Sequence, residues 1–131
     1  MRERIEKFIS IEKEIAEERG EFSLFALFLR EDSPDRWDLV VAADWFGGDQ
    51  KRTLDYFAKK LKSRLRLVEL IKISRIILLQ PNEASVKSIL QAFEVEHGCV
   101  EVRDSVFFGL HIKRGYIITS KREAPVPVTA D

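Results

Sequence analysis

Two apolar runs flank a polar segment near the start of the chain: Phe22-Ser-Leu-Phe-Ala-Leu-Phe-Leu-Arg30 and Trp37-Asp-Leu-Val-Val-Ala-Ala-Asp-Trp45. The segment between them contains Pro34, and this pattern predicts a β-hairpin with a long loop. In the first run, apolar residues occupy both parities of a strand, as Phe25 and Phe28 illustrate. A strand that is apolar on both faces has to be covered on both faces, so we expect it in the middle of a sheet.

The other elements are predicted from hydrophobic periodicity and from capping and turn residues. Helices are expected over 1–19, from the Asp49 cap to about Glu69 and after the Asn82 cap, with further strands at Ser74–Leu79, Cys99–Arg103, Val106–Ile112 and Tyr116–Thr119. The order α-β-β-α-β-α-β-β-β predicts an α+β fold with a mixed, largely antiparallel sheet of about six strands and three helices packed on it. The strand–helix–strand passage from Trp37 to Leu79 is expected to join parallel strands.

Local details of these elements are also predicted. The second helix is expected to bury a stripe that consists of Leu54, Phe57, Ala58, Leu61, Leu65 and Val68. Turns are expected at Asp104-Ser105 and at Lys113-Arg114-Gly115. Gly109 would then lie inside a strand, where a glycine indicates a bulge or a close approach of the backbone.

The bulk properties limit the class of protein. A chain of 131 residues is long enough for one domain, which we expect to span 1–122, with 123–131 as a flexible tail that contains two prolines. Cys99 is the single cysteine, so a disulfide framework or a cysteine-based zinc site is not expected. The N-terminus lacks an apolar signal core, and no apolar run is long enough to span a bilayer, so we expect a cytoplasmic protein without a membrane partner.

The net charge of zero hides an asymmetry along the chain. Residues 1–50 hold seven Lys/Arg and thirteen Asp/Glu, a net charge of −6, while residues 51–131 hold fifteen and nine, a net charge of +6. This polarity indicates either attraction between the two halves within the monomer or steering of a partner or a second copy. The first interpretation is the simpler one.

The known catalytic patterns fail on count or on spacing. Asp38 and Asp44 share a strand parity but would lie about 20 Å apart, too far to share a two-metal site. Glu94 and His97 form a single Glu-x-x-His, whereas di-iron bundles use two copies and further glutamates. The basic outer face of the second helix has Tyr56 as its one interleaved aromatic residue, so nucleic-acid binding is not expected. No metal, cofactor or catalysis is therefore predicted, although the sequence leaves an enzyme open.

One small-ligand site is nevertheless conceivable at the turn between the second strand and the second helix. Its candidate residues are Asp44, Gly47, Gly48, Lys51 and Arg52. The two glycines allow a sharp turn and a close approach of a ligand, and the start of a helix attracts anions. Against this stands Asp49, an acid that would cap the helix itself and repel an anion. A plain strand-to-helix turn explains the same residues.

Two tryptophans, Trp37 and Trp45, bracket the second strand and are candidate interface residues, since exposed tryptophans often mark interfaces. They can equally close the two ends of one core face. The leading functional hypothesis is a small binding, regulatory or interaction protein without catalysis of its own, in which a homodimer is conceivable. The alternative is an enzyme or sensor that binds a small phosphorylated ligand at Gly47-Gly48.

Overall fold

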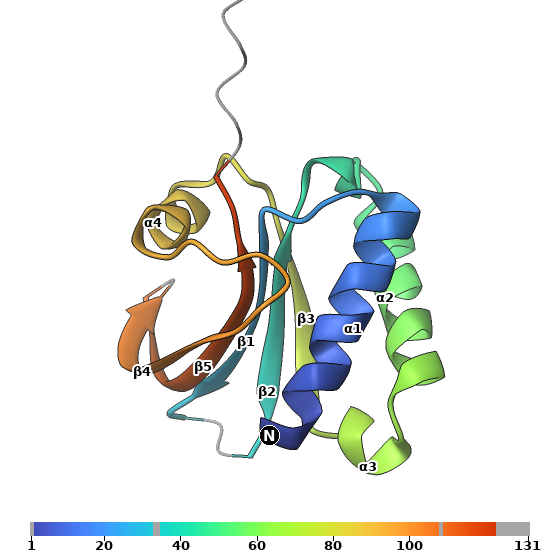
Figure 1. Ribbon diagram of the computed structural model, residues 1–131, viewed down its shortest axis with the longest axis horizontal. Coiled ribbons are helices and arrows are strands. Elements are labelled where there is room, and N and C mark those ends of the chain that lie inside the picture. Colours follow the sequence, from blue (N-terminus) through green and yellow to red (C-terminus); the bar gives the residue numbers. More distant parts are fainter. Residues whose placement is uncertain (1, 33–34, 108, 123–131) are drawn as a thin grey trace, which may run out of the picture.

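A computed structural model describes residues 2–32, 35–107 and 109–122, and it contains one mixed five-stranded sheet with helices on both faces (Figure 1). The elements are α1 (Arg2–Arg19), β1 (Leu24–Arg30), β2 (Trp37–Ala42), the 3-10 turn η1 (Asp44–Phe46), α2 (Gln50–Arg64), α3 (Leu67–Leu70), β3 (Ile73–Leu79), α4 (Ala84–Ala92), β4 (Val100–Phe107) and β5 (Leu110–Ser120). The α+β class is therefore confirmed. The tail expected at 123–131 lies outside the described residues.

β1 is the central strand of the sheet, whose order is β3-β2-β1-β5-β4. It pairs antiparallel with β2 and with β5, while β2 and β3 pair in parallel. The residues from Leu24 to Phe28 are all buried, which confirms the prediction from their apolar parities. The expected parallel crossover between β2 and β3 is confirmed as well.

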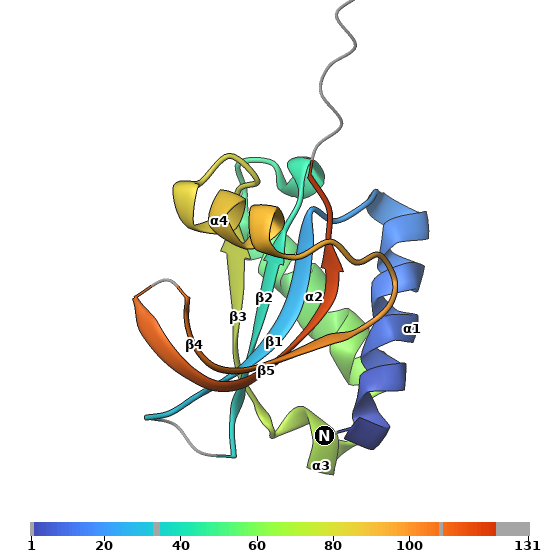
Figure 2. The same cartoon turned by 60° about the vertical axis from the view of Figure 1, so that its left-hand side comes forward.

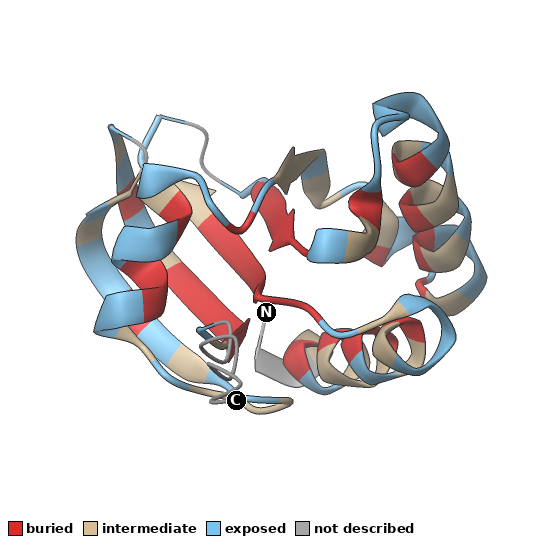
Figure 3. Cartoon of the chain, turned by 90° about the horizontal axis from the view of Figure 1, so that it is seen from above, coloured by how far each residue is buried: buried red, intermediate tan, exposed pale blue. Residues whose placement is uncertain are grey.

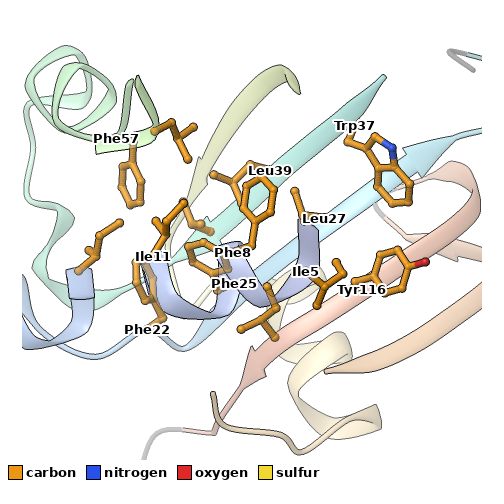
Figure 4. Close-up of a cluster of buried hydrophobic side chains, with 14 of the residues drawn as sticks. Ile5, Phe8, Ile11, Phe22, Phe25, Leu27, Trp37, Leu39, Phe57 and Tyr116 are labelled. Carbon is orange, nitrogen blue, oxygen red and sulfur yellow. The ribbon is translucent and has the colours of Figure 1, made fainter. Parts of the chain in front are cut away.

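The sheet separates two apolar cores; Figure 3 marks the buried residues along the chain, and Figure 4 shows the core that contains Phe8 and Phe25. One face is covered by α1 and α2; α1 contributes Ile5, Phe8, Ile11 and Ile15 at helical spacing, and Phe25 faces them from β1. The other face is covered by α4 and by the curled β4–β5 hairpin, and Phe28 lies in that core. Each side of the central strand thus has its own hydrophobic layer, which is why both parities of the sequence are apolar.

The two halves of the chain attract each other within the monomer, as the charge asymmetry indicates. Lys60 of α2 lies 2.8 Å from Glu14 and 2.7 Å from Glu18 of α1, and Arg64 contacts Glu14 and Ser10 at 2.5 and 2.8 Å. These hydrogen bonds lower the pKa of both glutamates, with the bond from Lys60 as the largest cause in each case. One row of cations on α2 is therefore neutralised by α1.

The C-terminal part differs from the prediction, because two long strands replace the three short ones. Asp104 stays inside β4 by adopting a left-handed backbone with φ of 48°, and the turn lies at Gly109, with φ of 73°, rather than at 104–105. Gly115 lies inside β5, at a position that has no room for a side chain. A Cβ there would come within 2.6 Å of Phe28 Cδ1 and 2.8 Å of Val102 Cγ2. Gly115, which the sequence predicted in a turn, is therefore a strand residue that allows close packing.

The second helix also differs from the prediction. α2 ends at Arg64 because Leu65 has extended dihedral angles, and a separate short helix, α3, follows. Val68 was expected in the buried stripe, but it is 50% exposed. The last helix begins at Ala84 with Glu83 as its N-cap instead of Asn82. Among the described residues, no helix is both long and apolar enough to cross a membrane.

Candidate functional site

The predicted small-ligand turn is a well-capped helix start. Asp49 Oδ1 accepts a hydrogen bond of 3.1 Å from the Arg52 amide, and Thr53 Oγ1 donates one of 2.9 Å to the Phe46 carbonyl. Gly47 needs its glycine because its φ is 69°, but a Cβ on Gly48 would meet nothing within 4 Å. The turn is open, and an acid already occupies part of the helix terminus.

All five residues predicted for this site, Asp44, Gly47, Gly48, Lys51 and Arg52, lie at this turn and are exposed. The geometry therefore brings them together at one open, exposed turn. It supports a plain helix start more directly than an anion site.

The two tryptophans belong to the core that α1 and α2 cover. Trp37 is 6% exposed and its ring lies 5.5 Å from that of Tyr116. Trp45 packs between the Phe22 and Phe57 rings, at 5.6 and 6.0 Å. Its ring also lies against Gly20, where an added Cβ would come within 2.8 Å of Trp45 Cδ1. These placements fit tryptophans that close the ends of one core face.

A buried carboxylate lies on β2, away from that turn. Asp38 is 3% exposed, and its Oδ2 accepts a hydrogen bond from Arg75 Nη2 at 3.0 Å and forms a salt bridge with Arg30 Nε at 3.1 Å. The hydrogen bond with Asp38 raises the pKa of Arg75. Both guanidinium groups use the same oxygen, and Oδ1 is buried without a hydrogen-bond partner in the described part of the chain. The cluster ties β1, β2 and β3 together across the sheet.

A second buried carboxylate, Glu12, joins α1 to the segment before β4. Its side chain is fully buried, accepts from Thr119 Oγ1 at 2.9 Å and lies 2.5 Å from His97 Nδ1. The other ring nitrogen of His97, Nε2, is 4.0 Å from a carboxylate oxygen of Glu96. The imidazole therefore faces acids on two sides, and Glu94 of the Glu-x-x-His pattern is exposed and takes no part in this pair. Glu12 therefore anchors the segment between α4 and β4 to α1.

A third buried carboxylate fixes α3. Glu69 is 3% exposed, accepts from Lys7 Nζ at 2.8 Å and accepts from the Arg66 amide at 2.8 Å. The hydrogen bond from Lys7, followed by that from Arg66, lowers the pKa of Glu69 to about 2. Glu69 and Leu70 of this short helix face the rest of the fold, whereas Leu67 and Val68 are exposed. The ion pair between Glu69 and Lys7 therefore holds α3 with Leu67 and Val68 toward solvent.

That outward face of α3 is apolar. Leu67 is 74% exposed, Val68 50% and Ile71, directly after the helix, 61%. Side chains of this size are normally covered, and a contiguous group of them marks a contact surface. The sequence already held a signal: residues 67–71 include four apolar residues, more than one side of a short helix can bury. This signal was missed because the sequence predicted one long helix that runs to about Glu69.

The exposed face of α3 adjoins an open groove between α2 and β3. The groove has a volume of about 440 Å³ and is lined by Leu54, Asp55, Ala58, Leu61, Lys62, Leu70, Ile73, Ser74, Arg75 and Ile76. Its wall is mainly aliphatic, and Asp55 and Lys62 are the charged residues that α2 contributes. Figure 1 shows α3 at the lower end of α2, next to the start of β3.

β3 is an edge strand along its whole length. It pairs with β2 on one side, and its other side has no backbone hydrogen bonds to any described residue. Its sequence is Ile-Ser-Arg-Ile-Ile-Leu-Leu, and its five large apolar side chains are each partly exposed. Such an edge presents unpaired N–H and C=O groups next to apolar side chains, and it is a template for pairing with another strand. We refer to this edge, the adjoining groove and the exposed face of α3 as the β3 surface.

The described residues hold no group of three or more side chains suited to bind a metal ion. The buried carboxylates described above are each paired with basic side chains that belong to the fold. No protein-family model, curated protein or solved structure matches the chain. Among the described residues, the β3 surface combines an unpaired strand edge, a groove and exposed apolar side chains that internal packing does not use.

Proposed function

We propose that this protein is a non-catalytic binding protein that holds an extended, apolar segment of a polypeptide against the edge of β3. The proposal is carried by one observation: an unpaired strand edge, an apolar groove and the exposed apolar residues of α3 adjoin one another. Extended segments add to such edges through main-chain hydrogen bonds, and the neighbouring pockets select every second side chain.

The groove defines the chemistry of the segment. Side chains on one face of an added strand would point under α2, toward Leu54, Leu61 and Ile76, and would have to be apolar. Burying one such side chain contributes about 1.5–3 kcal/mol, which adds to the main-chain hydrogen bonds along the edge and offsets the cost of association. Arg75 and the charges of α2 lie at the rim, where they affect choice of partner more than affinity.

Selection of peptides from a random library displayed on phage tests the proposal. We expect the recovered peptides to alternate apolar and polar residues, as a strand with one buried face does. Their binding should weaken at least tenfold in Ile76→Lys and in Ile71→Glu, which place charges in the groove and on α3. Lysine at position 76 can keep its stem in the groove and its ammonium group in water, so the fold should persist.

Val106→Lys is the matched control, because it puts the same charge on β4 at the opposite edge of the sheet. Val106 is 59% exposed, and this variant should bind the selected peptides as the parent protein does. Melting temperatures of all variants show whether each one is folded. Recovery of no peptide above background would contradict the proposal, and so would peptides that bind Ile76→Lys and Ile71→Glu as well as the parent.

A further inference from the structure

We propose that the segment held at the β3 surface is β3 of a second copy of this chain, so that two molecules join their edges antiparallel into one continuous sheet. This inference rests on the proposed function, because it names the occupant of the same edge. A two-fold dimer needs a surface that is complementary to itself, since each residue meets a symmetry-related patch. The strand, the helix beside it and the charges on that helix all meet this condition.

The strand is complementary to itself in one register. β3 has seven residues with Ile76 at the centre, and its regular part, residues 75–79, can pair antiparallel with a second copy about Ile76. Arg75, the one charged residue of the strand, then lies opposite the partner's Ile77. Pairing about Arg75 instead would set two arginines against each other, which destabilises a strand pair. The sequence of β3 therefore favours the register centred on Ile76.

The helix beside the strand carries self-complementary charges. Asp55, Ala58 and Lys62 are three and four residues apart, so they share one face of α2, and all three line the groove next to β3. A two-fold axis near Ile76 and Ala58 reverses the direction of α2 in the second copy. Asp55 then faces the partner's Lys62, and Lys62 faces the partner's Asp55, so two attractive pairs form at once.

These charges are unused within the monomer. In the described part of the chain, neither Asp55 nor Lys62 takes part in a salt bridge or in a side-chain hydrogen bond. The neighbouring cations Lys60 and Arg64, on the side of α2 that faces α1, are both paired. The small side chain of Ala58 between the two charges leaves room for a second helix to approach.

The same symmetry explains the exposed face of α3. This helix lies at the end of β3 where the strand begins (Figures 1 and 2). Antiparallel pairing brings the last residues of the partner's β3 to that end, next to Leu67 and Ile71. Stable dimers bury about 800 Å² on each partner, which is about a tenth of the 7963 Å² that this chain exposes.

Charge reversal tests this arrangement, with association followed by sedimentation velocity over a series of concentrations. The parent protein should be a dimer that dissociates on dilution. Asp55→Lys alone and Lys62→Asp alone each create two repulsive pairs across the axis and should weaken association about tenfold. Asp55→Lys with Lys62→Asp in one chain restores both attractive pairs. A mixture of the two single variants should form heterodimers, because every cross pair is then attractive again.

Ile76→Lys should abolish association, whereas Val106→Lys on β4 should leave it unchanged. A parent protein that stays monomeric while it still binds the selected peptides would overturn the second-copy inference and leave the proposed function in place. Absence of both association and peptide binding would overturn both. A dimer that is insensitive to Ile76→Lys and to both charge reversals would use another surface and would also overturn the inference.

Discussion

The two edges of the sheet differ in the features that keep strands from pairing. β4 has Glu101, Arg103 and Asp104 along its length, and Asp104 bends the strand with its left-handed backbone. β3 has a single charge, Arg75, which an acid on the neighbouring strand already binds. Charges and bends protect an edge from other chains. β4 therefore has the features that protect an edge, and β3 has few of them.

Curvature adds to the difference between the edges. The pairing of β1 with β5 shifts register twice, between Phe25 and Ala26 and between Leu29 and Arg30. Each shift adds a residue to β5 and bends it, so the β4–β5 hairpin curls over the sheet toward α4 (Figure 2). β3 follows β2 with one shift at its start and is otherwise regular. A regular edge can accept a strand, and a curled one cannot do so easily.

The largest effect is expected at the strand that holds both edges together. Phe25 and Phe28 are 0% and 1% exposed and lie in the two different cores. Phe25→Ala and Phe28→Ala should each lower the free energy of unfolding by about 3–5 kcal/mol in urea denaturation. The exposed-site control Val106→Ala should change it by about 0.5 kcal/mol or less. If either phenylalanine is nearly neutral, the two-sided core is wrong.

A smaller effect is expected where the β4–β5 hairpin curls. Gly115→Ala places a methyl group against Phe28 and Val102, so we expect overpacking to cost about 1–3 kcal/mol of unfolding free energy. The matched control is Gly48→Ala, whose Cβ meets nothing within 4 Å. Equal effects of the two substitutions would show that Gly115 is not needed for the close approach of Phe28.

The position of α3 beside β3 should depend on pH through Glu69. The pKa of Glu69 in the folded protein is about 2, below the ordinary value of 4.5. The ionised carboxylate therefore stabilises the fold fully at pH values above about 4.5. This contribution is lost as the pH falls from about 4.5 towards 2. Thermal melts should show that Glu69→Gln loses less stability than the parent over this window. Parallel pH profiles for the two proteins would contradict the role given to the Lys7–Glu69 pair.

Much of the fold was predictable because its signals are local. Apolar residues at both odd and even positions of 22–29 predicted that β1 lies in the centre of the sheet, and apolar residues at helical spacing predicted α1. The missed features involve contacts between distant residues: Gly115 leaves space for Phe28 within the sheet, and Glu69 of α3 binds Lys7 of α1. A sequence pattern contains neither contact, so it predicted a turn and a longer helix.

The candidate site was missed for the same reason. The five residues predicted for a ligand turn are neighbours in sequence, so a short pattern could find them. The β3 surface combines α2, α3 and β3, and its meaning depends on β3 being the edge of the sheet. Strand order was not predictable from the sequence. The apolar residues of 67–71 were visible, but their exposure was not.

Hydrogen exchange of single backbone amides, measured by NMR, tests the central claim most directly. Spectra would be compared between dilute protein and protein in complex with a second copy or with a selected peptide. We expect slower exchange at the outward-facing amides of β3, with no change along β4. Slower exchange along β4, or an unchanged β3 in a protein that demonstrably binds, would contradict it.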